Sequence, residues 1–270
     1  MKIEDVILGV RFAKYASDEL KGELPCPVAG MRKIENKGTD TQAFLFQTAT
    51  RLYIVFPCTA SARDVLTDLD VKMTDWVLAG PKPGSVIKAR VARGFLAAWT
   101  SINTELIQAI WEMWDDRDVM ICGYSLGGAL AIPCGLTMLY STADVQMVTC
   151  GGPRFGDAAF RDVFQAWIPA GRFVRLVNRG DPYPQVPNQE PSLFAGRLYQ
   201  HVVPETTVAH GKATPPRPRA WWERAWHYSV RWVTARLGNK IDPRKAPLHS
   251  INLTLDWLEA QRKAGQTELA

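Results

Sequence analysis

The hydrophobic positions along the chain form short apolar runs separated by segments with helical periodicity. The apolar runs 44–46 and 52–56, divided by the polar stretch 47–51, predict an antiparallel hairpin whose second strand is fully buried. From Gly94 onward apolar residues recur at helical spacing, so we predict a long amphipathic helix that ends before Asp115. The recurring residues are Phe95, Trp99, Ile102, Leu106 and Ile110.

Three more apolar strands follow, and two of them lead into helices. The pattern predicts strands over 119–122 and 145–150, followed by helices over about 128–139 and 158–167. A third strand, 173–177, ends in the turn sequence NRGDP. Strands that alternate with helices indicate a mostly parallel sheet with helices on both faces, so the predicted fold class is α/β.

Composition places the chain among ordinary folded proteins. Of its 270 residues, 47% are hydrophobic and 22% are charged, which disfavours disordered, collagen-like and repeat classes. We expect one domain over residues 1–270, with an insertion described below. The longest apolar run, 126–140, is too short to cross a bilayer.

Targeting and cysteine signals point to a reduced compartment. The first residues carry charges around a short apolar stretch, so a signal peptide is not expected. The five cysteines have neither disulfide-framework nor zinc-ligand spacing. We therefore expect a cytoplasmic protein with reduced thiols and without a bound metal.

The candidate nucleophile is Ser125, in the sequence Gly123-Tyr-Ser-Leu-Gly127, which fits G-x-S-x-G. A serine flanked by glycines can be a simple turn. Here a predicted buried strand precedes it and a predicted helix follows it, which is the context of a nucleophile elbow. In that arrangement the glycines permit a tight turn and the helix N-terminus points its positive end at the reacting carbonyl.

The candidate acid and base lie further along the chain. Asp181 follows the third strand by a few residues; its alternative reading is a turn residue before Pro182. Asp157 and Asp162 are interpreted as helix caps. Of the four histidines, His249 lies on the loop entering a final apolar-patterned helix, which favours it as the base, and His201, in a strand-like segment, is next. The other two are His210 and His227.

These motifs, taken together and in order, resemble those of class 3 (fungal-type) lipases, members of the α/β-hydrolase superfamily. GYSLGGAL is similar to that family's GHSLGGAL, CGGPRFGDAAF to FGSPRVGDxxF, and RLVNRGDPYPQVP to RVVNxxDxVPxLP. HSINLTLDWL resembles the terminal segment with the catalytic histidine, whereas LYQHVVPE resembles a non-catalytic strand. The resemblance implies an α/β-hydrolase fold and a catalytic triad of Ser125, Asp181 and His249 that needs no cofactor or metal.

The resemblance also implies an oxyanion hole. The sequence Phe56-Pro-Cys-Thr59 matches the family's FRGT, so the backbone N–H groups of Thr59 and Leu126 are expected to hold the oxyanion. Proline and cysteine replace the usual Arg-Gly, and Tyr124 replaces the common histidine before the nucleophile. The family's short lid aligns with residues 60–66.

A basic, tryptophan-rich insertion occupies residues 211–245. It holds nine Lys or Arg against two acidic residues, a net charge of +7, so the total of +5 leaves −2 for the rest of the chain. If helical, it has the apolar stripe and cationic flank of an interfacial helix. It could contact anionic membrane, act as a further lid or pack on the enzyme body. Nucleic acid is not an expected partner, because no reading motif accompanies the charge.

The sequence thus predicts a serine hydrolase that cleaves carboxylic esters, with acylglycerols or related lipids as substrate. Two alternatives remain open. One is a phospholipase of the same chemistry, and the other is a membrane-surface binding protein on a hydrolase scaffold, in which 211–245 is the functional part.

Overall fold

A computed structural model describes most of the chain. It covers residues 1–19, 30–58, 70–80, 82–141, 144–181, 183–187, 199–208 and 249–269. The predicted lid segment 60–66, the predicted oxyanion residue Thr59 and the insertion 211–245 lie outside these ranges.

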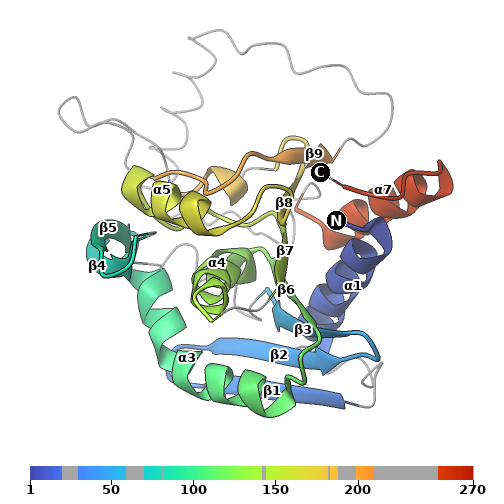
Figure 1. The fold of residues 1–270 in the computed structure, drawn as a ribbon. Helices are drawn as coiled ribbons and strands as arrows, with labels where there is room; N and C mark the ends of the chain where they lie inside the picture. Colours follow the sequence, from blue (N-terminus) through green and yellow to red (C-terminus); the bar gives the residue numbers. More distant parts are fainter. Residues whose placement is uncertain are drawn as a thin grey trace, which may run out of the picture.

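A seven-stranded sheet in the order β1-β2-β3-β6-β7-β8-β9 forms the centre of the molecule (Figure 1). The first three strands pair antiparallel, and every pair from β3 to β9 is parallel. Its strands are β1 (Gly30–Asn36), β2 (Thr41–Gln47), β3 (Arg51–Phe56), β6 (Asp118–Tyr124), β7 (Val145–Cys150), β8 (Phe173–Asn178) and β9 (Thr206–Val208). The predicted α/β class, with a mostly parallel sheet, is confirmed.

Helices cover both faces of this sheet. Two of them, α1 and α7, lie side by side on one face, and α3, α4 and α5 lie on the other (Figure 1). The helices are α1 (Ile3–Glu19), α3 (Arg93–Met113), α4 (Leu126–Leu139), α5 (Ala158–Trp167) and α7 (Ile251–Lys263), with a short 3₁₀ helix η1 (Tyr183–Gln185). No helix in the part of the chain that the structure describes has the length and apolar character needed to span a bilayer.

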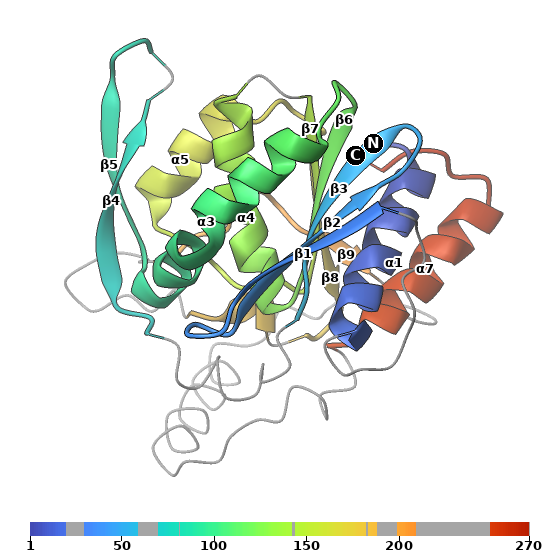
Figure 2. The same cartoon turned by 90° about the horizontal axis from the view of Figure 1, so that it is seen from below.

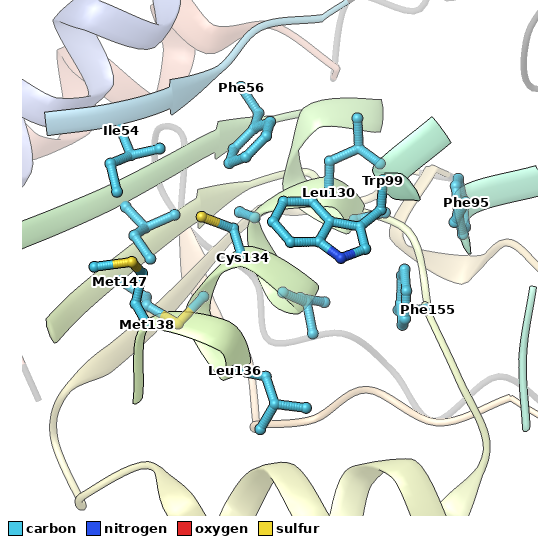
Figure 3. Packing of buried hydrophobic residues seen from close by; sticks show 14 of the residues in the cluster. Ile54, Phe56, Phe95, Trp99, Leu130, Cys134, Leu136, Met138, Met147 and Phe155 are labelled. Atoms are coloured by element: carbon cyan, nitrogen blue, oxygen red, sulfur yellow. The ribbon is translucent and has the colours of Figure 1, made fainter. Parts of the chain in front are cut away.

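The buried hydrophobic residues form two clusters, and the larger lies between the sheet and helices α3 and α4. There Trp99 of α3 and Leu130 of α4 gather with Phe56 of β3, all at most 4% exposed (Figure 3). Because α4 is buried nearly all round, its sequence is apolar on every face rather than amphipathic. This packing fixes α4 behind the end of β6, where Ser125 lies.

A second, two-stranded sheet stands apart from the central one (Figure 2). It consists of β4 (Met73–Ala79) and β5 (Val86–Ala92), paired antiparallel. Trp76 fixes the hairpin to the body, since its ring lies 6.0 Å from that of Phe155 and 5.9 Å from that of Phe160. Both phenylalanines are completely buried.

The ends of the described chain meet beside α1 and α7. The N-terminal amine of Met1 donates to the Leu269 carbonyl at 3.0 Å, and the Leu269 N–H donates back to the Met1 carbonyl at 2.8 Å. Arg11 of α1 and Glu259 of α7 form an ion pair at 2.6 Å. The chain ends that flank α1 and α7 are therefore hydrogen-bonded to each other, and an ion pair joins the two helices.

The predicted strands and helices listed above occur within a few residues of their expected bounds, but the strand expected around His201 is wrong. Residues 199–205 contain only an isolated bridge at Gln200, and β9 begins at Thr206. Pro204 has no N–H to donate to a strand ladder, which disfavours a continuous strand there.

Candidate active site

Ser125 lies in a sharp turn between β6 and α4. Its backbone has φ 55° and ψ −122°, a conformation that costs a non-glycine residue about 1–3 kcal/mol. A side chain at Gly123 would place its Cβ 2.4 Å from the Gly127 carbonyl oxygen, and one at Gly127 would come within 2.2 Å of the Phe56 carbonyl oxygen. The flanking glycines therefore permit the close backbone approach that holds the serine in this turn.

The structure brings Ser125, His249 and Asp181 together. The His249 Nε2 lies 2.8 Å from the Ser125 Oγ, and its Nδ1 lies 2.8 Å from the Asp181 Oδ2. A carboxylate can only accept, so Nδ1 carries the proton donated to Asp181 and Nε2 accepts from the serine hydroxyl. That tautomer lets the imidazole remove the proton from Ser125.

The Asp181 carboxylate is oriented by its own turn. After β8 the Asp181 N–H donates to the Asn178 carbonyl at 3.0 Å, which closes the turn. The Tyr183 N–H donates to the Asp181 Oδ1 at 2.9 Å, which leaves Oδ2 for His249. Both carboxylate oxygens thus have fixed donors, and all three members of the Ser-His-Asp group are at most 5% exposed.

Two tyrosine rings and a glycine surround the imidazole of His249. The Tyr183 ring lies 4.0 Å from it, centroid to centroid, and the Tyr124 ring lies 5.5 Å away at an interplanar angle of 20°. A Cβ at Gly151 would come within 2.8 Å of the His249 Cε1. None of these contacts was predicted from the sequence. The one available signal was that Tyr183 and Gly151 lie in the motifs matched around Asp181 and after β7.

Of the two predicted oxyanion-hole residues, Leu126 lies within the described structure. Leu126 is the first residue of α4, so its N–H belongs to the group that a helix leaves without an intrahelical acceptor, at the positive end of the helix dipole. Thr59 lies outside the described residues, but β3 pairs in parallel with β6 up to Phe56 and Gly123. Pro57 and Cys58, which follow β3, therefore leave the sheet at the edge where Ser125 stands.

The other candidate base, His201, lies elsewhere. Its Nε2 is 2.7 Å from the Pro184 carbonyl oxygen, and no hydrogen bond joins it to Ser125 in the described structure. Burial, reinforced by the positive charge of Arg175, lowers the pKa of His201 to about 3. An imidazole with that pKa is a poor proton acceptor near neutral pH. His210 and His227 lie outside the described residues.

The described part of the chain shows no metal centre, since no group of three or more His, Cys, Asp or Glu side chains there is arranged to hold an ion. Cys122, Cys134 and Cys150 are buried, and burial raises the pKa of each thiol, that of Cys150 to about 12. These thiols stay protonated near neutral pH and are poor nucleophiles.

One known protein family matches this chain. The model of the family described as "Lipase (class 3)" matches residues 53–190, just over half of the chain. The chain belongs to the class 3 lipase family. The matched range contains β6, the serine turn and the Asp181 turn, while His249 lies beyond it.

Individual proteins with the names lipase and phospholipase are similar to this chain. A lipase of Rhizopus niveus is 29% identical over 162 residues, which covers 56% of this chain and 39% of that protein. A chloroplastic phospholipase A(1) of Arabidopsis thaliana is 27% identical over 206 residues, covering 71% of this chain and 42% of that protein. The chain thus aligns with well under half the length of these curated relatives.

A solved lipase supports the same fold. The crystal structure of a lipase from Rhizopus microsporus var. chinensis aligns with a TM-score of 0.54 and 26% identity, covering 69% of each chain. The predicted α/β-hydrolase architecture agrees with this likeness.

Proposed function

We propose that this protein is a serine hydrolase that cleaves carboxylic esters of lipids, with acylglycerols as the principal substrate class. The observation that carries the proposal is the hydrogen-bonded series Ser125, His249 and Asp181 at 2.8 Å per link, in a chain of the class 3 lipase family. The name of the Rhizopus niveus relative supports a lipase activity.

The geometry supports acyl transfer through a covalent intermediate. His249 Nε2 takes the Ser125 proton as Oγ attacks the ester carbonyl, and Asp181 stabilises the imidazolium that forms. The oxyanion of the tetrahedral intermediate accepts from the Leu126 N–H and, in our proposal, from that of Thr59. His249 then protonates the departing alcohol, and water activated by the same imidazole releases the acid and restores Ser125.

The nucleophile Ser125 is shielded from solvent, so a substrate has to gain access to it. Ser125 is 0% exposed, so an ester has to displace the atoms that cover its hydroxyl before it can react. Once an ester fills this covered site, water is excluded from it, and the hydrogen bonds that stabilise the oxyanion become stronger.

A phospholipase is the second candidate, because the phospholipase A(1) relative aligns over more of this chain than the Rhizopus niveus lipase does. Hydrolysis of an acylglycerol and hydrolysis of a phospholipid would use the same triad. The two substrates differ in the group attached to the glycerol. Comparing turnover of an ester series from acetate to oleate with that of phosphatidylcholine, each with and without an interface, distinguishes them.

We also propose that residues 211–245 bring the enzyme to anionic membrane. The net charge of +7 and the four tryptophans of this segment support the proposal. The rival view, a membrane-binding protein without catalysis, does not account for the hydrogen-bonded triad.

The proposed mechanism is tested by substitution of the triad. Ser125→Ala should lower the kcat for p-nitrophenyl butyrate by at least about 10⁴-fold and abolish labelling by a fluorophosphonate. Asp181→Asn should cost a similar factor, since it stops fixing the imidazole tautomer. Ser101→Ala serves as the control, because it removes a serine hydroxyl of α3 whose hydrogen-bond partners are Thr39 and Ala98. Undiminished turnover by Ser125→Ala would exclude the mechanism.

A further inference from the structure

The backbone at His249 is held from outside its own helix. Ser250 is the N-cap of α7, so His249 precedes the regular hydrogen bonding of that helix, and Ser250 makes no side-chain cap bond. Two side chains at the ends of central strands bond to this segment instead. The Tyr124 hydroxyl donates to the His249 carbonyl at 2.7 Å, and the Asn178 Nδ2 donates to the Ser250 carbonyl at 2.9 Å.

Tyr124 has a second connection to the reacting groups. It is the last residue of β6 and immediately precedes Ser125 in the chain. Its ring lies along the imidazole of His249, 5.5 Å from it between centroids and 20° from parallel. One side chain therefore links the backbone that carries the nucleophile to the backbone and ring of the base.

The Tyr124 hydroxyl stays a donor under working conditions. Burial raises the pKa of this phenol far above its usual value, and the neighbouring Cys58 thiol adds to the effect. The hydroxyl therefore keeps its proton near neutral pH. The matched family motif has histidine at this position, so the phenol–carbonyl bond is a feature of this chain rather than of the motif.

We propose that Tyr124 is a positioning residue that sets the distance between His249 Nε2 and Ser125 Oγ. The inference rests on the proposed ester hydrolysis and adds to it a residue outside the triad. Proton transfer requires that distance to stay near its present 2.8 Å, and a displacement of about 1 Å can cost about 100-fold in rate. Without the phenol bond, the His249 carbonyl loses its anchor to β6.

The test removes only the hydroxyl. Tyr124→Phe keeps the ring beside the imidazole and deletes the bond to the His249 carbonyl. Tyr140→Phe is the matched control, because the Tyr140 hydroxyl also donates to a backbone carbonyl, that of Ala79 at 3.0 Å, beyond α4. Each variant is measured as the full chain with p-nitrophenyl butyrate, well below its melting temperature.

Two readouts separate positioning from a purely structural role. We expect kcat to fall about tenfold in Tyr124→Phe, with KM within about twofold of the parent value and no change in Tyr140→Phe. The low-field NMR resonance of the proton between His249 Nδ1 and Asp181, assigned by its loss in His249→Gln, should shift or broaden in Tyr124→Phe alone.

Either of two results would overturn the proposal. One is a kcat within twofold of the parent value in Tyr124→Phe, whatever its melting temperature, and the other is a reduced kcat with an unaltered His249 resonance. If the parent protein shows no ester turnover, the proposed function fails, and the resonance alone then decides whether Tyr124 positions His249.

Discussion

Gly151 gives the His249–Asp181 pair the room it occupies. It follows β7 directly, has φ +63°, and donates its N–H to the Leu176 carbonyl of β8 at 2.9 Å. A Cβ there would meet the His249 Cε1 at 2.8 Å and the Asp181 Oδ2 at 3.0 Å. A side chain at this position would thus collide with both the base and the acid.

We predict that Gly151→Ala separates the base from the nucleophile. The kcat for a soluble ester should fall at least about tenfold, because the methyl group displaces the imidazole from Ser125. Gly171→Ala is the control, since Gly171 has a similar φ of +75° but nothing within 4 Å of its added Cβ. Both variants place an alanine at a positive φ, but only in Gly151→Ala does the added methyl group collide with His249 and Asp181. Equal kcat values in the two variants would refute this assignment.

Ser125 and Gly151 differ in whether neighbouring residues in the sequence determine their roles. The turn at Ser125 was predictable because the strand, the two glycines and the helix that create it are contiguous. The role of Gly151 depends on the approach of His249, which is distant in sequence, so local pattern could not reveal it. Tyr183 is a similar case, because its contact with His249 exists only after the strands are assembled.

At the scale of elements, the segment after Asp181 is held by His201 and Arg154. The His201 Nε2–H donates to the Pro184 carbonyl at 2.7 Å, and the Arg154 backbone N–H donates to the Val186 carbonyl at 2.8 Å. The Arg154 guanidinium also donates to the Gln185 side chain and to the Pro187 carbonyl, at 2.8 and 3.0 Å. These bonds fix η1, whose first residue, Tyr183, orients the acid.

The partly buried His201 should make the fold sensitive to acid. Its pKa is lowered to about 3, below the value of about 6.5 of an exposed histidine, so the unfolded chain binds a proton that the folded chain does not. This contribution to stability is complete above about pH 6.5 and is lost as the pH falls toward 3, by about 1.4 kcal/mol per unit.

We predict that His201→Gln removes this pH-dependent contribution to stability while keeping a hydrogen-bond donor near the Pro184 carbonyl. The free energy of unfolding of the parent protein, measured with urea between pH 7 and 4, should decline more steeply than that of the variant. The difference between the two proteins isolates His201, since all other titrating groups are shared. A difference that stays constant over this range would show that His201 does not titrate between its folded and unfolded pKa values.

Some elements were predictable and others were not, for a physical reason. Strands β6, β7 and β8 are buried on both faces, so apolar residues predominate in each and the strands stand out in the sequence. In the β4–β5 hairpin, Leu78 is buried while its neighbour Val77 is 63% exposed, so the apolar pattern does not mark the buried face. The three residues of β9 are too few to show any period.

At the scale of the whole molecule, charge is divided between the body and one segment. The body carries a net −2 and many of its charged side chains are paired, as in Arg11–Glu259 and Lys88–Asp75, at 2.6 and 2.7 Å. Residues 211–245 carry +7 and lie outside the described residues. Attraction to an anionic surface should therefore depend on where positive charge is removed and not only on how much.

We predict that membrane binding follows the segment rather than the net charge. Two variants, both on a Ser125→Ala background that spares the lipid, each replace five basic residues by Gln and reach the same formal charge of about zero. One changes the segment, at Arg217, Arg219, Arg224, Arg231 and Arg236, and the other changes exposed lysines of the body, at Lys2, Lys37, Lys72, Lys82 and Lys263.

Each basic residue near an anionic surface contributes about 1 kcal/mol, so five removals from a segment that docks there should abolish sedimentation with phosphatidylserine–phosphatidylcholine vesicles. The body variant should keep most of its binding, and binding by the parent chain should weaken as salt is raised, because the Debye length shortens. Equal loss in both variants would mean that net charge alone drives the association. Equal retention would show that the positive charge of residues 211–245 does not drive the binding, and the electrostatic part of the proposal would fail.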